Sequence, residues 1–231
     1  MNRTVEYNRR LAALSQEAAA GRAWVAGDIA PTGLFLAPLG EASFEELVDI
    51  YTEQAAGLEE AGVDLYAIET MMTLSDARAA VLAVRSVSDK PIFVSFTCDP
   101  TGRTLTGTDV AAALTVLQGM GVSAFGLNCS AGPAQMLPLL QRLREYARVP
   151  LLAKPNAGMP WIITKNTLML QAPKKRPRPS RNWAAPRMWR KRYGRVPGHS
   201  SVRRCRITAC QNRAADAEKA RCGLCWLSLQ F

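Results

Sequence analysis

Five short apolar runs recur along the first 160 residues, and each is nearly continuous in apolar residues rather than alternating with polar ones. The runs span residues 24–29, 65–69, 92–97, 124–129 and 151–154. Strands that are buried on both faces have this pattern, because helices cover both sides of the sheet or barrel wall they belong to. The pattern therefore predicts five buried, parallel β-strands.

Segments with helical periodicity lie between these runs. The clearest covers residues 44–61, where apolar side chains recur at helical spacing. Ser43 can cap its first turn and Glu46 completes a capping box, while Gly62 follows as a stop signal. Three further helices are predicted, over residues 76–87 behind Ser75, over 109–120 behind Thr108, and from Pro133 onward.

Strands that alternate with helices predict an α/β fold with a parallel sheet, either a closed barrel or an open, doubly wound sheet. Polar residues stand at the carboxyl ends of successive strands, among them Asp28, Glu69, Asn128 and Asn156. Sites assembled from many strand ends favour the barrel. No Gly-x-Gly-x-x-Gly follows a strand, which counts against a dinucleotide-binding fold. We therefore predict a partial (β/α)8 TIM barrel.

The pattern breaks off at residue 160. Residues 161–231 carry 17 Lys and Arg against two acidic residues, a net charge of +15, whereas residues 1–160 carry 12 against 17, a net charge of −5. The second part also contains a basic run broken by prolines and lacks a periodic apolar pattern. We predict a partial barrel domain over 1–160 and a disordered basic tail without strands over 161–231.

Composition excludes several classes of protein. No segment approaches the roughly 18 apolar residues of a membrane span, and the amino terminus lacks the apolar core of a signal peptide. We therefore expect a cytoplasmic protein. His199, in the tail, is the only histidine, which excludes a Ser-His or Cys-His mechanism in the first 160 residues.

Cys129 ends an apolar run and is followed at once by a glycine-proline turn. This position places a thiol at the carboxyl end of a predicted strand, where α/β proteins build their sites. The alternative is a buried structural cysteine, which is the preferred interpretation for Cys98. Two cysteines in 160 residues do not predict a disulfide framework.

Five motifs occur in order and at compatible spacing: Val25–Gly33, Ile68–Met71, Val94–Phe96, Gly126–Cys129 and Pro155–Gly158. On these motifs, residues 1–160 resemble the homocysteine S-methyltransferase domain, a zinc-dependent (β/α)8 barrel. Within that family they are most similar to the homocysteine module of cobalamin-dependent methionine synthases. The resemblance implies that the five strands are the third to seventh of eight. It also implies methyl transfer to the thiol of homocysteine, which forms methionine.

The resemblance assigns roles to four residues. Cys129 matches one of three thiolate ligands of zinc, and the other two, an adjacent pair on the eighth strand, have no matching positions. Glu69 matches a glutamate that helps to hold the amino group of homocysteine, Asn128 adjoins the metal ligand, and Asp28 lines the same mouth. Three thiolates would hold zinc and leave a position for the homocysteine sulfur. With one ligand of three, we expect impaired or absent catalysis.

The methyl donor stays open. Methylcobalamin carried on another domain, S-methylmethionine and betaine are all compatible with the resemblance. The tail has two further interpretations: a zinc site built from Cys222 and Cys225 with Cys205 and Cys210, which lacks the paired spacing of zinc ribbons, and a basic segment that contacts nucleic acid.

A frameshift near codon 160, with a missing upstream segment, would explain the break, and the coding nucleotides would test it.

The alternative to an enzyme is a non-catalytic barrel fragment whose basic tail makes non-specific polyanion contacts. A closed barrel has no edge strands, whereas five of its eight strands form a sheet with two open edges. We expect residues 1–160 to be unstable alone or to form an open sheet with helices on its outside.

Overall fold

The computed structural model describes residues 3–156, 160–164, 167–170 and 224–225. In chain order the elements are α1 (Arg3–Ala19), β1 (Trp24–Ile29), α2 (Phe44–Glu60), β2 (Leu65–Met71), α3 (Leu74–Val87), β3 (Ile92–Phe96), α4 (Val110–Gly119), β4 (Ala124–Asn128), α5 (Pro133–Arg144), β5 (Leu151–Lys154), β6 (Pro160–Thr164), β7 (Thr167–Leu170) and β8 (Leu224–Cys225).

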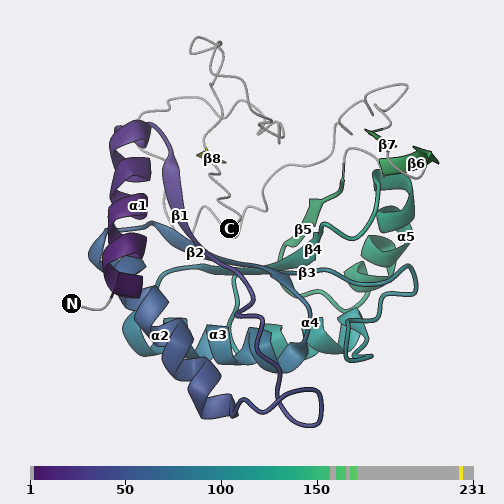
Figure 1. Ribbon diagram of the computed structural model, residues 1–231, viewed down its shortest axis with the longest axis horizontal. Coiled ribbons are helices and arrows are strands. Elements are labelled where there is room, and N and C mark those ends of the chain that lie inside the picture. The colour runs from purple at the N-terminus through teal and green to yellow at the C-terminus, as the bar shows by residue number, and fades with distance from the viewer. Residues whose placement is uncertain (1–2, 157–159, 165–166, 171–223, 226–231) are drawn as a thin grey trace.

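The first five strands pair in parallel in sequence order, and the sheet has the order β5-β4-β3-β2-β1-β8. The sheet is strongly curved, with helices α1 to α5 around its convex face (Figure 1). This arrangement confirms the predicted five parallel strands and the partial TIM barrel. The open sheet with helices on its outside, expected from the sequence, is what the described residues form.

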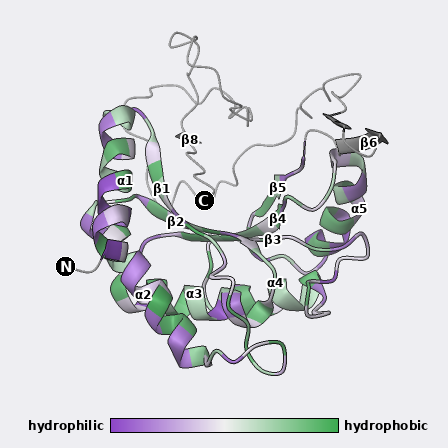
Figure 2. Ribbon diagram, viewed as in Figure 1, coloured by the Kyte–Doolittle hydropathy of each residue, from purple (hydrophilic) through white to green (hydrophobic). Residues whose placement is uncertain are grey.

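Alternation along each strand sends its side chains to the two faces in turn. The outward positions join one hydrophobic core with the helices, and their largest fully buried members include Tyr66, Ile68, Phe96 and Phe125. Figure 2 shows apolar residues along the sheet, while hydrophilic residues recur on the helices. The inward positions of the same strands are left to line the concave face.

Helix α2 has the ends that the sequence predicts. The Ser43 hydroxyl accepts a hydrogen bond of 3.0 Å from the Glu46 N–H, and Gly62 adopts a φ of +75°. That left-handed conformation costs glycine little, so the helix stops there.

Two predicted caps are wrong. Helix α3 begins at Leu74 because the Thr73 hydroxyl, and not Ser75, accepts the Asp76 N–H at 3.1 Å. Helix α4 is capped by Asp109 rather than Thr108. At both helix starts two nearby residues have side chains that could cap the helix, and the backbone geometry selects one of them.

Helix α1 was not predicted. Its buried residues are the small Ala12 and Ala19, so its sequence lacks a wide apolar stripe. The helix packs closely on α2, where a Cβ added to Gly57 would lie 2.6 Å from the carbonyl oxygen of Val5. Small residues permit this close contact, and they give little periodic signal.

The prediction that no strand follows residue 160 is wrong. β6 and β7 form an antiparallel pair, and β8 pairs in parallel with β1. β6 and β7 contain β-branched residues that favour strands, and β8 covers backbone groups at the edge of β1. The predictions for Cys205, Cys210, Cys222 and His199 lie outside the described residues. The predicted domain boundary stays a prediction.

A search of the described helices finds none long and apolar enough to cross a bilayer.

Candidate functional site

Polar side chains gather on the concave face at the carboxyl ends of the strands. Asp28 on β1, Glu69 on β2, Asn128 on β4 and Lys154 on β5 all occupy inward positions, since their neighbours along each strand pack outward. Asn128 and Lys154 are direct partners in the parallel ladder. These four residues, with Cys129, are called the mouth cluster below.

An ion pair crosses this mouth. The Lys154 ammonium contacts the Glu69 carboxylate, although β3 and β4 separate their strands. Flat strands three places apart would be about 14 Å apart, so the contact depends on the curvature of the sheet. Glu69 is only 8% exposed, and a buried carboxylate needs a charged partner. Lys154 is therefore a site residue that the sequence analysis did not identify.

Asp28 differs from Glu69 in having a side-chain oxygen without a hydrogen-bond partner among the described residues. This oxygen, Oδ1, is buried. Burial raises the pKa of Asp28 to about 7, the charge of Glu69 adds to the rise, and the charge of Lys154 opposes it. Gln54 fixes the strand here by donating to the Asp28 carbonyl at 3.2 Å. The mouth therefore contains a carboxylate held in place without a partner for one oxygen.

Asn128 connects the strand ends. Its Oδ1 accepts the Thr70 N–H at 3.2 Å, and its Nδ2 donates to the Thr70 hydroxyl at 2.7 Å and to the Cys129 sulfur at 3.4 Å. The side chain is buried, and these three bonds engage both its oxygen and its amide group. Asn128 thereby ties the residue that follows Glu69 to the thiol of Cys129.

Backbone strain is concentrated at the same place. Thr70 and Cys129 have φ values of +63° and +54°, a region that side chains disfavour. Such conformations cost on the order of 1 to 3 kcal/mol each and persist where the surroundings enforce them. Here Asn128 holds both. The result is an exposed Cys129 thiol at the rim of the mouth.

The second cysteine has a structural environment. Cys98 is half-buried against the hydrophobic core, and its N–H donates to the Ser130 hydroxyl at 3.0 Å. Burial raises the pKa of its thiol, which favours the protonated, unreactive form. Ser130 donates in turn to the Asn128 carbonyl at 3.0 Å, so this contact supports the turn after β4.

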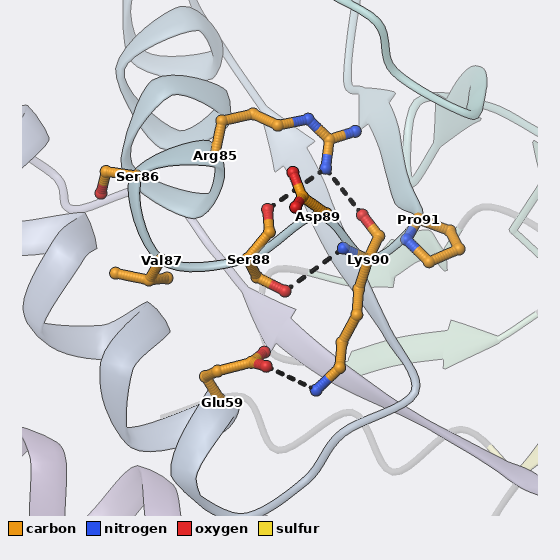
Figure 3. A pocket seen from close by; sticks show the side chains of 8 residues that line it. All are labelled: Glu59, Arg85, Ser86, Val87, Ser88, Asp89, Lys90 and Pro91. Atoms are coloured by element: carbon orange, nitrogen blue, oxygen red, sulfur yellow. Dashed lines mark hydrogen bonds and ion pairs between the residues drawn. The ribbon is translucent and has the colours of Figure 1, made fainter.

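A hollow at the other end of the strands has a different composition. It lies where α3 ends and β3 begins, and Figure 3 shows the Lys90 ammonium directed at Glu59 and the Arg85 guanidinium directed at backbone carbonyls. Lys90 pairs with Glu59 at 2.7 Å, while Arg85 donates to the Lys90 carbonyl at 2.7 Å. Residues at the amino ends of barrel strands generally serve stability. We therefore assign no chemistry to this hollow.

Comparison with known proteins identifies the family. The family model for homocysteine S-methyltransferase matches residues 1–194. The chain belongs to this family. The match covers the mouth cluster and continues past residue 160, where the sequence pattern changes.

Two curated relatives are methionine synthases, from Mycobacterium tuberculosis and Mycobacterium leprae. Each is 38% identical to this chain over 142 residues, which is 59% of this chain and 12% of the relative. The chain therefore matches only a small part of the length of these methionine synthases.

The solved structures point to the same family. The homocysteine methyltransferase MmuM from Escherichia coli, in its apo form, superposes with a TM-score of 0.53 at 28% identity, covering 64% of this chain and 54% of that one. Its metallated form gives a TM-score of 0.53 at 27% identity, with the same coverage. This chain spans about half of the MmuM chain.

Zinc is the metal that the sequence resemblance implies, and the described residues do not fit it. They contain no group of three His, Cys, Asp or Glu side chains that could hold a metal ion. Cys129 offers a single thiol at the mouth, and zinc sites in proteins use three or four protein ligands. The described part of the chain thus accounts for no metal-dependent step.

Proposed function

We propose that this family member binds homocysteine in the concave mouth, as part of a reaction that transfers a methyl group to its sulfur and forms methionine. The observation that carries the proposal is the buried Oδ1 of Asp28, which has no hydrogen-bond partner among the described residues and is close enough to the Glu69 carboxylate to feel its charge. Two carboxylates on one face, one of them lacking a partner, suit an ammonium group. Family membership supports homocysteine as its carrier.

The α-ammonium of homocysteine would occupy the space between Asp28 and Glu69. There it would supply the missing hydrogen bond to Asp28 and oppose the effects that raise the pKa of this carboxyl. The substrate sulfur would point toward Cys129, which Asn128 links to the strand end beside Glu69. The described residues thus explain recognition of the amino acid, while methyl transfer by this chain is proposed to be impaired.

Titration calorimetry with homocysteine tests the recognition step on the full chain. Glu69→Gln removes one charge from the ammonium site, so its affinity should fall about 10- to 100-fold, the usual cost of losing a charged hydrogen bond. Glu59→Gln is the matched control, since Glu59 pairs with Lys90 in the hollow at the opposite end of the strands. Equal affinities of wild type and Glu69→Gln, or no binding by wild type, would contradict the proposal.

A second function is favoured by charge alone. Residues 161–231 have a net charge of +15, which suits non-specific contacts with polyanions, nucleic acid included. Two measurements separate the two proposals. Homocysteine binding, or about one zinc per chain that is lost in Cys129→Ser, would support the methyltransferase, whereas salt-sensitive polyanion binding by a protein that does not bind homocysteine would support the alternative. The methyl donor stays open, and the cytoplasmic location stays a prediction.

A further inference from the structure

We propose that Lys154 determines specificity by binding the α-carboxylate of the amino-acid substrate, after the substrate's ammonium replaces it at Glu69. This inference rests on the proposed function and concerns the same mouth. It adds a residue to the site and a requirement for a free carboxylate in the ligand.

The Glu69 carboxylate is nearly buried, and in the free protein the Lys154 ammonium is its charged partner. An incoming ammonium at the same carboxylate makes two cations compete for one anion. An anion near the displaced Lys154 ammonium would then stabilise it, because separating a partly buried charge from its counter-charge is costly.

In an α-amino acid the ammonium and the carboxylate are attached to the same carbon atom. An ammonium that takes the place of Lys154 at Glu69 therefore brings its carboxylate close to the displaced lysine. The lysine side chain is 32% exposed, against 10% for that of Glu69, so Lys154 is the partner with room to move.

Asp28 and Glu69 are two acids and Lys154 is one base, and an α-amino acid contributes one charge of each sign. After the exchange the ammonium contacts both acids, including the orphaned Oδ1 of Asp28, and the carboxylate contacts Lys154. Every charge then has an opposite partner in a shielded mouth, where such contacts are stronger than in water.

The ligand class follows from this arrangement. The site should select amino acids with both α-groups free and reject an amine that lacks the carboxylate. The lysine ammonium is a point charge at the end of a flexible side chain, so its contact with the carboxylate does not require a fixed backbone geometry.

The experiment compares two ligands on the full chain by titration calorimetry under reducing conditions. Homocysteine has the α-carboxylate, and 3-aminopropane-1-thiol is the same molecule without it. Wild type should bind homocysteine about 10- to 100-fold more tightly, in line with one charged hydrogen bond. In Lys154→Met this ratio should fall close to one, and Lys154→Arg should restore most of it.

Lys90→Met is the control, because the Lys90 side chain is also 32% exposed and also pairs with a glutamate. It should keep the wild-type ratio. If Lys154→Met does not fold, the double variant Lys154→Met/Glu69→Gln removes the uncompensated charge and should bind both ligands equally.

The outcomes separate this inference from the proposed function. A wild-type protein that binds homocysteine but does not prefer it over the amine overturns the role of Lys154 alone. So does a Lys154→Met variant that keeps the wild-type ratio. A wild-type protein that binds neither ligand overturns the proposed function itself, and this inference with it.

Discussion

Asp28 and Glu69 are carboxylates on neighbouring strands, yet their surroundings differ. Glu69 has Lys154 as its counter-charge, whereas Asp28 has a buried oxygen without a partner among the described residues. Desolvation by burial is the largest cause of the raised pKa of Asp28, followed by repulsion from Glu69. The ionised form of Asp28 is therefore less favourable in the folded protein than in the unfolded chain.

This difference predicts a pH-dependent stability. A carboxyl whose pKa rises from 3.8 to about 7 on folding makes its full contribution to stability below pH 3.8, and that contribution is lost progressively as the pH rises from there through about 7. Asp28→Asn cannot ionise, so above pH 7 it should be more stable than wild type by at most about 4 kcal/mol. Urea unfolding at pH 5 and pH 8 measures this, and an equal pH dependence for both proteins would refute it.

The residues of the mouth cluster were only partly predictable. The sequence indicated four of them because each stands at the carboxyl end of a predicted strand: Asp28, Glu69, Asn128 and Cys129. The structure places them at one mouth, and their roles stay proposals. Lys154 was predicted only as the last residue of the strand at 151–154. A lysine that ends an apolar run was the available signal, but its partner lies 85 residues away, and only the curvature of the sheet brings them together.

At the scale of elements, the strands were the most predictable part. The runs at 24–29 and 151–154 match β1 and β5 end for end, and the other three differ by one or two residues. Continuous apolar runs give a strong signal because the strands are buried on both faces. Helix α1 gave little signal because it buries small residues, and β6 to β8 because their sequence departs from the earlier pattern.

The pairing of β4 with β5 depends on a glycine. A Cβ added to Gly126 would overlap the carbonyl oxygen and Cβ of Leu152 on the neighbouring strand. Backbone atoms in a ladder cannot move aside without breaking the pairing. The close approach also sets the distance between the strands that carry Asn128 and Lys154.

Gly126→Ala should therefore destabilise the protein by about 3 kcal/mol, at the upper end of the usual cost of overpacking. Gly119→Ala is the control, because a Cβ at this exposed helical position meets no atom within 4 Å. The control should match wild type or gain up to about 1 kcal/mol from helix propensity. Urea midpoints of the three proteins provide the measurement, and equal midpoints would contradict this account of the β4–β5 contact.

At the scale of the whole molecule, the described residues form a curved half of a barrel with helices on one side and the mouth on the other (Figure 1). Alternation of strands and helices predicted this architecture, and the polar strand ends indicated the barrel rather than the doubly wound sheet. The second part could not be predicted in the same way. Its strongly basic sequence gives no period from which elements can be placed.

We propose that the change in composition at residue 160 is a domain boundary. Limited digestion with subtilisin, which has broad specificity, should then leave a stable product that starts near the amino terminus and ends near residue 160. Mass spectrometry of the time course measures the end point. A persistent product that extends through residue 194, the end of the family match, would place the boundary later and contradict the proposal.

The amide of Asn128 has a practical consequence. It receives the Thr70 N–H from one strand end and directs its own N–H at the Cys129 sulfur on another. Alkylation or oxidation of that sulfur would disturb the amide and, through it, the Thr70 proton. The Thr70 resonance in a ¹⁵N-labelled sample is thus a remote sensor for the chemical state of Cys129, readable without any substrate present.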